Sequence, residues 1–140
     1  MKRFGLVVCL GVALLGAYTM GANAGGKKAD PRVFELRTYT PAPGKMDALQ
    51  ARFRDHTCAL FEKHGIKNIG YWVNADGKPE DQKLIYIVAH KSREAAGQSW
   101  KEFASDPDWK AAQSESEKDG KLAIKVESVY MNPTDFSKLK

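Results

Sequence analysis

Apolar residues follow two different spacings along this chain, and the order of these spacings restricts the possible folds to a few. Residues 33–40 alternate between apolar and polar side chains and are rich in β-branched and aromatic residues, which predicts a β-strand. Residues 45–64 carry apolar side chains at helical spacing, and Gly65 follows as a C-terminal cap. The first elements of the fold are therefore predicted to be a strand and a helix.

The later segments repeat these two patterns. They predict, in turn, a strand at residues 66–74, a strand at 83–90, a helix at 92–104, a short helix beginning at Pro107 and a strand at 122–131. Because only a short turn separates the second strand from the third, we expect these two strands to form an antiparallel hairpin. The order predicts an α+β fold of the ferredoxin-like type, βαββαβ, with a four-stranded antiparallel sheet.

In this fold the helices cover one face of the sheet and leave the other face bare. Side chains alternate along a strand, so Phe34 and Leu36 point to one side of the first strand and Glu35, Arg37 and Tyr39 to the other. We expect a second copy of the chain to pack sheet to sheet and to bury the side that carries Glu35, Arg37 and Tyr39. The sequence thus predicts a homodimer.

Residues 1–24 have the composition of a signal peptide. A positively charged start precedes an apolar run over residues 4–18, and Ala22 and Ala24 satisfy the small-x-small rule for signal peptidase. We therefore expect cleavage after Ala24 and a periplasmic or secreted protein. An uncleaved membrane anchor is the competing interpretation, and the short apolar run argues against it.

After this cleavage the chain would consist of a polar lead-in, residues 25–32, and one domain, residues 33–140. Loss of Lys2 and Arg3 lowers the formal net charge from +5 to +3, and the remaining basic residues are scattered among acidic ones. We therefore expect no nucleic-acid binding, and no membrane contact once the signal peptide is removed. Cys58 would be the only remaining cysteine, either a buried small residue or an exposed thiol.

Several short motifs occur in register along the chain: Glu35–Tyr39, Pro43–Lys45, Lys63–Gly65, Gly70–Trp72, Asp106–Trp109 and Asn132–Ser137. Together they resemble the NIPSNAP family of the dimeric α/β barrel superfamily. The resemblance spans Val33 to Phe136 and implies a ferredoxin-like subunit that dimerises through its sheet. It implies no particular reaction. The chain departs from the family at the end of the third strand, where Val88, Ala89 and His90 replace an aromatic pattern.

His56 is the candidate catalytic residue. On a helical wheel it lies within about 60° of Leu49, Phe53 and Leu60, inside the face that should meet the sheet. An imidazole there is either a hydrogen-bonded core residue or a ligand-facing acid or base.

The remaining candidate ligand-binding residues are Arg37, Tyr39, Tyr71, Trp72 and Tyr86. Arg37 lies two positions from Glu35 on one strand face, so it either forms an ion pair or binds an anion. The aromatic residues of the hairpin either line a pocket for a flat ligand or belong to the core. His90, at the end of its strand, is expected to be exposed.

No metal site or cofactor is expected. His56 and His64 lie about two helical turns apart, roughly 12 Å, which is too far to share one ion. The chain carries no phosphate-binding glycine loop, no Gly-x-Ser-x-Gly and no Cys–His nucleophile pattern.

Two functions from different classes fit these observations. The first is a non-catalytic dimeric module that binds a small ligand, such as an aromatic compound, or a partner. The second is a cofactor-independent monooxygenase or isomerase acting on a small aromatic or quinone-like compound between sheet and helices, as in the wider superfamily. His56, as general base or haem ligand, would then act with Trp72 and Tyr86.

Overall fold

The computed structural model describes residues 32–140, and the predicted signal peptide and nearly all of the lead-in lie outside this part of the chain. The elements in chain order are β1 (Val33–Pro41), α1 (Met46–Arg52), the π-helical turn η1 (Phe53–Thr57), α2 (Cys58–Lys63), β2 (Lys67–Val73), the 3-10 turn η2 (Pro79–Asp81), β3 (Leu84–His90), α3 (Arg93–Ser105), α4 (Pro107–Ser116) and β4 (Ala123–Met131). Each strand therefore matches its predicted span to within one residue at either end.

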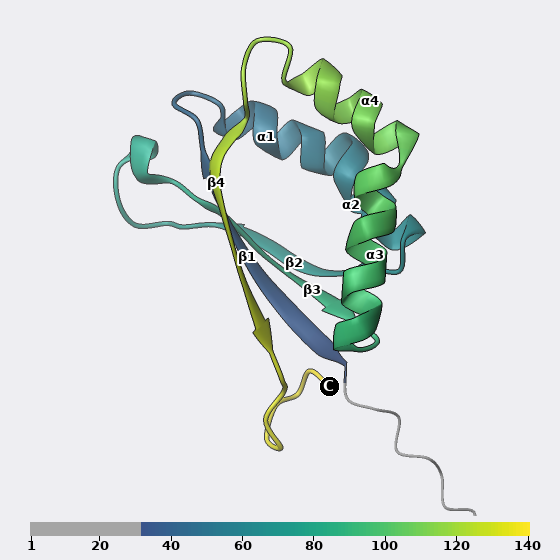
Figure 1. The fold of residues 1–140 in the computed structure, drawn as a ribbon. Helices are drawn as coiled ribbons and strands as arrows, with labels where there is room; N and C mark the ends of the chain where they lie inside the picture. Colours follow the sequence, from purple (N-terminus) through teal and green to yellow (C-terminus); the bar gives the residue numbers. More distant parts are fainter. Residues whose placement is uncertain (1–31) are drawn as a thin grey trace, which may run out of the picture.

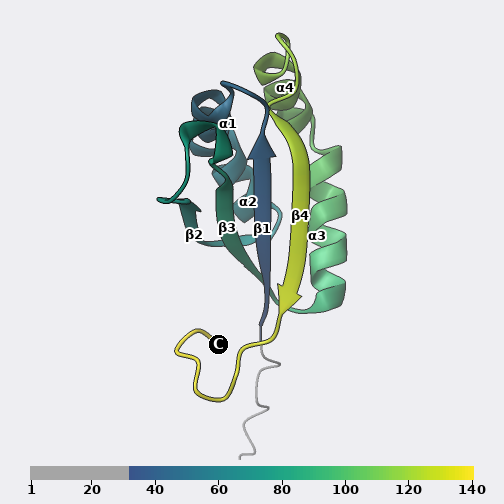
Figure 2. The same cartoon turned by 90° about the vertical axis from the view of Figure 1, so that its left-hand side faces the viewer.

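The four strands form one antiparallel sheet in the order β2-β3-β1-β4. The helices lie on one face of this sheet, as Figure 1 shows from the side, and the other face is bare, as Figure 2 shows from the front. The predicted α+β ferredoxin-like fold is confirmed. None of the helices between residues 32 and 140 combines the length and apolar character that a membrane crossing requires.

Aromatic rings fill the layer between sheet and helices. Phe61 packs edge-on against Phe103 and Trp100, with ring centroids 4.9 and 5.1 Å apart, and Phe53 packs against Tyr86 at 5.2 Å. Edge-to-face aromatic pairs of this kind add to the stability that burial itself supplies. The helices are thereby fixed on the sheet by interlocking rings.

The first helical segment contains one wide turn, η1, between α1 and α2. Buried side chains recur at every fourth position, at Leu49, Phe53, Thr57 and Phe61. In an α-helix of 3.6 residues per turn, a spacing of four drifts by about 40° at each step, and the extra residue of the π turn offsets this drift. Thr57 therefore takes the inner position, and the prediction that His56 meets the sheet is wrong, because its side chain is exposed.

The two faces of β1 are also the reverse of the expectation. Glu35 is hydrogen-bonded to Trp100 of α3 and Tyr39 packs on Phe53 of η1, so this side points toward the helices. The strand register places another set on the bare face: Phe34, Leu36, Trp72, Ile85, Ile87 and Val129. The polar side of β1 is inside because its groups are paired there, and the apolar set lies on the bare face, beside the exposed Lys125–Glu127 pair of β4.

Gly65 ends α2 in the conformation that the sequence predicts. Its φ is +73°, its N–H donates to the carbonyl of Glu62, and the N–H of Ile66 donates to that of Phe61. These two bonds satisfy the last carbonyls of the helix. A Cβ at Gly65 would meet only Ser99 Oγ, at 3.7 Å, so the backbone angle alone requires glycine.

Gly65→Ala is expected to lower the free energy of unfolding by about 1–2 kcal/mol, because a side chain disfavours the left-handed conformation. Gly97→Ala is the matched control, since Gly97 lies exposed inside α3 with open space around its Cβ. That control should be neutral or should stabilise by up to about 1 kcal/mol. Urea unfolding of both variants measures the difference, and equal stabilities would contradict the assignment.

Candidate functional site

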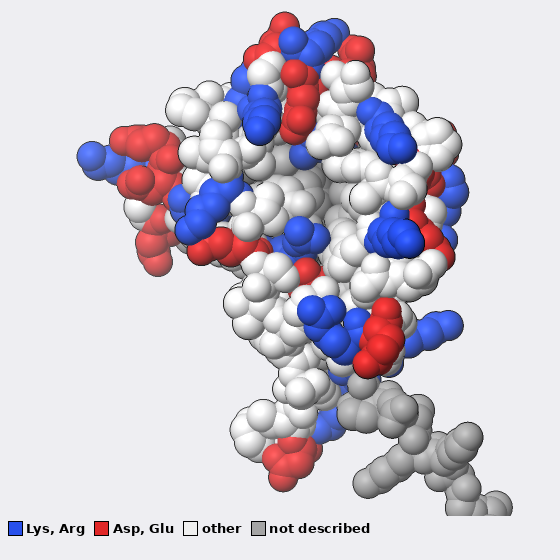
Figure 3. All heavy atoms as spheres, in the orientation of Figure 1, with Lys and Arg blue, Asp and Glu red and all other residues white. Residues whose placement is uncertain are grey.

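An open cleft lies between the sheet and α3, on the side of β4. Its volume is about 440 Å³, and it is lined by Glu35, Arg37 and Tyr39 from β1, by Trp100, Phe103 and Ala104 from α3, and by Ser128 and Tyr130 from β4. Figure 3 shows the molecule hollowed between β4 and α3, with basic and acidic atoms inside the hollow. The cleft exists because the helices leave the inner face of the edge strand β4 largely uncovered.

The carboxylate of Glu35 organises the floor of this cleft. It is 2% exposed and accepts hydrogen bonds from Trp100 Nε1 at 2.7 Å, Ser128 Oγ at 2.6 Å and His90 Nε2 at 3.0 Å. Burial of the carboxyl raises its pKa, but the three hydrogen bonds and the charge of Arg37 outweigh burial and lower the pKa of Glu35 from 4.5 to about 2. Glu35 is therefore ionised at neutral pH.

His90 is buried, which corrects the expectation that it is exposed. Its side chain belongs to the helix-facing side of β3, where the ring packs 5.9 Å from that of Trp100, and residue exposure is 2%. An ionised carboxylate can only accept hydrogen bonds, so Nε2 of His90 carries the proton shared with Glu35. Its Nδ1 has no hydrogen-bond partner among the described residues.

Arg37 lies beside this carboxylate without a hydrogen bond to it. Its Nε is 3.7 Å from Glu35 Oε1, which makes an ion pair but is too long for a hydrogen bond. The guanidinium lies over the ring of Trp100, 4.3 Å from the centroid, and 5.8 Å from that of Tyr39. Both the ion pair and the anion-binding interpretation of Arg37 therefore remain compatible with its position.

The other predicted site residues are distributed over different parts of the molecule. Tyr86 is fully buried behind the cleft, where burial raises the pKa of its phenol well above the ordinary value, and Tyr71 stacks on it at 5.1 Å. Trp72 is on the bare face and 52% exposed. Of the six predicted ligand-binding residues, only Arg37 and Tyr39 line the cleft.

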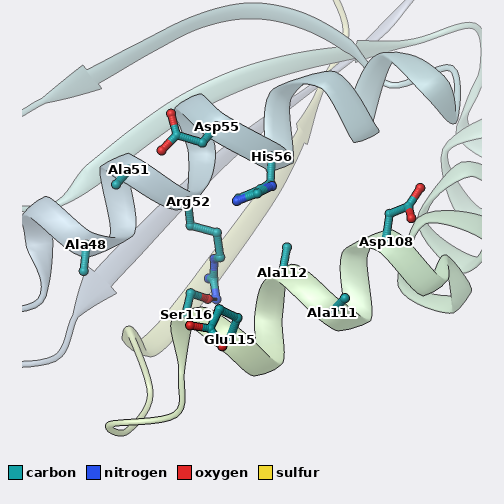
Figure 4. Close-up of a pocket in the computed structure, with 10 residues that line it drawn as sticks. All are labelled: Ala48, Ala51, Arg52, Asp55, His56, Asp108, Ala111, Ala112, Glu115 and Ser116. Carbon is teal, nitrogen blue, oxygen red and sulfur yellow. Dashed lines mark hydrogen bonds between the residues drawn. The ribbon is translucent and has the colours of Figure 1, made fainter.

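His56 lines a different cavity, a groove of about 710 Å³ between the α1–η1 segment and α4. Figure 4 shows His56 and Arg52 pointing from that segment toward α4, with alanine side chains on both walls. Arg52 is paired across the groove with Glu117 Oε1 at 2.9 Å and Ser116 Oγ at 3.3 Å. A structural ion pair thus joins the two sides of the groove. None of the other predicted site residues lines it.

Sequence reasoning missed the residues that complete the cleft, Trp100, Phe103, Ser128 and Tyr130. A signal for two of them exists, because β1 and β4 are antiparallel neighbours and Ser128 pairs with Arg37 while Tyr130 pairs with Glu35. Side chains of paired residues share a face of the sheet. Within residues 32–140, no cluster of three or more His, Cys, Asp or Glu side chains is placed to hold a metal ion.

Glu35→Gln is expected to weaken the dependence of stability on acid pH. Because the pKa of Glu35 is lowered by folding, its ionised form stabilises the fold fully above pH 4.5, and this contribution is lost as the pH falls toward 2. The variant should be less stable than the wild type at pH 7, and the gap should narrow between pH 4.5 and 2. Urea unfolding at a series of pH values measures the gap.

Glu127→Gln is the control for this experiment, since Glu127 forms an exposed pair with Lys125 at 2.8 Å. An exposed pair contributes about 0–1 kcal/mol, so that variant should follow the wild type closely at every pH. Parallel stability curves for the wild type and Glu35→Gln would contradict the assignment of an ionised, hydrogen-bonded Glu35.

Comparison with known proteins identifies relatives of the whole domain. The NIPSNAP family model matches residues 34–138. A NIPSNAP family protein with unknown function from Agrobacterium tumefaciens is 23% identical, with a TM-score of 0.67 over 79% of this chain and 95% of that chain. A second from the same organism is 25% identical, with a TM-score of 0.67 over 78% and 99%.

An uncharacterized NIPSNAP domain protein from Burkholderia xenovorans is 20% identical, with a TM-score of 0.63 over 75% of this chain and 97% of that chain. No curated protein matches the chain. Similarity at this level of sequence identity shows a shared fold and nothing more. Because the family model extends over most of the sequence, from β1 to the residues after β4, the chain belongs to the NIPSNAP family.

Proposed function

We propose that this protein is an exported homodimer that binds a small, flat ligand in the cleft between the sheet and α3. The observation that carries the proposal is the cleft itself, where aromatic walls surround a fixed charged floor. Binding sites for small molecules combine apolar walls with a few convergent polar groups, in cavities of about 300–1,000 Å³. The cleft, at about 440 Å³, has both properties.

The groove that contains His56 supports ligand binding less well. Its walls are built from small alanine side chains, and its buried cation, Arg52, is already paired with Glu117. The residues required by the enzymatic alternative are also separate, since His56 lies in this groove, Tyr86 in the core and Trp72 on the bare face. Binding in the cleft is therefore the function that these positions favour.

The homodimer is supported by the apolar character of the bare sheet face. Leu36, Ile85 and Ile87 lie there only partly buried, and Trp72 and Val129 are more than half exposed. Soluble monomers rarely leave a large contiguous apolar patch in contact with water, and such patches mark interaction surfaces. A second copy packed sheet to sheet would cover this patch and would leave the cleft open on the opposite side.

Export is proposed from residues 1–24 alone, which have the charged start, apolar run and small-x-small site of a signal peptide. A periplasmic or secreted location follows from cleavage after Ala24. Amino-terminal sequencing of the protein purified from its own cells tests this part. A mature chain that begins at Gly25 is the expected result, and an intact Met1 would contradict it.

Val129→Lys is expected to convert the dimer to a monomer, because it places a charge inside the proposed apolar contact. Val126→Lys is the matched control, since Val126 is also exposed and lies on the same strand but on the other face of the sheet. Light scattering after gel filtration measures the mass of each protein. A monomeric wild type, or a dimeric Val129→Lys variant, would contradict the proposed dimer.

Ligand binding is tested with the three tryptophans as separate reporters, because they lie in different places. Trp100 lines the cleft, Trp72 lies on the bare face, and Trp109 packs over Arg52 and against Phe103 in the helical layer. A library of small aromatic compounds should contain members that shift the indole N–H resonance of Trp100 and leave those of Trp72 and Trp109 unchanged. Compounds that shift only the resonance of Trp72 or Trp109 would contradict ligand binding in the cleft.

A further inference from the structure

We propose that the cleft takes an aromatic carboxylate, with the carboxylate paired to the guanidinium of Arg37 and the ring between the aromatic walls. This inference rests on the proposed function, because it names the ligand class of the same cleft. It starts from Arg37, whose side chain is only 18% exposed. No hydrogen bond from its guanidinium to another described residue is present, and its buried Nε is without a partner.

Buried charged groups in proteins are normally hydrogen-bonded, because an unsatisfied one is costly. The nearby carboxylate of Glu35 does not serve this purpose, since its Oε1 lies 3.7 Å from Arg37 Nε, too far for a hydrogen bond. Oε2 accepts from Trp100 and His90, and Oε1 accepts from Ser128. Arg37 therefore keeps the capacity to donate to an acceptor that enters the cleft.

The position of Arg37 favours a planar acceptor. The guanidinium carbon of Arg37 lies over the ring of Trp100, 4.3 Å from its centroid, and the N–H donors of a guanidinium lie in one plane. A carboxylate matches this arrangement because its two oxygens can take two parallel N–H bonds. A neutral amide or alcohol of the same size cannot both accept two parallel N–H bonds and carry a negative charge.

The charge around the cleft is compatible with an anion. Glu35 is the one carboxylate among the lining residues, and three donors besides Arg37 stabilise its charge. Arg93, at the start of α3, lies 3.6 Å over the ring of Tyr130 and adds a second cation at one side of the cleft. The site is therefore not dominated by negative charge.

The remaining walls favour an aromatic body for the ligand. Tyr39, Phe103 and Tyr130 supply ring surfaces, and Ala104 leaves space beside them. Rings in such positions bind a flat ligand by offset or edge-on packing. A carboxylate without a ring would leave these surfaces in water, so both parts of the ligand contribute.

The test is a titration of ¹⁵N-labelled protein with benzoate, benzamide and acetate, followed by the indole resonances. Benzoate should shift the Trp100 resonance in a saturable way and leave Trp72 unchanged. Benzamide, the uncharged match, and acetate, the carboxylate without a ring, should each bind about tenfold or more weakly, because a charged hydrogen-bonded pair or the ring contact is lost.

Arg37→Gln should weaken benzoate binding about tenfold or more, and Arg54→Gln, which removes an exposed arginine of η1, should bind benzoate as the wild type does. Arg37→Lys keeps the charge but not the paired donors, and should also bind more weakly. The ligand comparison on the wild-type protein stands by itself if these variants do not fold.

Equal affinities for benzoate and benzamide at Trp100 would overturn the carboxylate inference and leave the proposed aromatic cleft intact. Equal affinities for benzoate and acetate would overturn the aromatic part. If none of the three compounds shifts Trp100, the inference is wrong, and the wider library screen then decides the proposed function separately.

Discussion

The buried carboxylate of Glu35 is the interaction on which the arrangement of this domain depends. It receives hydrogen bonds from Trp100 on α3, Ser128 on β4 and His90 on β3, so one side chain of β1 joins three other elements. Breaking a buried ionic network by removing one partner typically costs about 3–5 kcal/mol, since the remaining groups lose their acceptor. The same bonds hold Glu35 in place, with Arg37 Nε 3.7 Å from its Oε1, so the guanidinium has no hydrogen bond to this carboxylate.

The order of elements and their approximate ends could be predicted from the sequence, because strand alternation, the Gly65 cap and the short hairpin turn are local signals. The rotation of the first helical segment could not. A wheel of 3.6 residues per turn places His56 with Leu49 and Phe53, whereas the wide turn at Phe53–Thr57 places Thr57 there instead. One additional residue in a turn therefore moved the candidate catalytic residue from the sheet-facing side of the helix to the groove beside α4.

The prediction of which side of β1 faces the helices was wrong for a related reason. Glu35 and Arg37 look like solvent-facing residues when each is considered alone, yet their partners lie far along the chain, at Trp100 and Ser128. A polar residue is stable in the interior only when those partners are in place, and a single segment does not contain that information. The prediction that His90 is exposed was wrong for the same reason. Arg37 and Tyr39, two of the predicted ligand-binding residues, line the cleft because they share the strand face that carries Glu35.

Strand β4 connects the two proposed properties of the protein. Val129 and Met131 point to the bare face, where the proposed partner would pack, whereas Ser128 and Tyr130 point into the cleft. As an edge strand without a helix over it, β4 is held on the inner side mainly through the bond from Ser128 to Glu35 and the contact of Arg93 with Tyr130. Packing of a second copy against the outer side would restrict the strand further. Dimerisation would thereby fix the wall of the cleft, so the proposed assembly and the proposed ligand binding would both use β4.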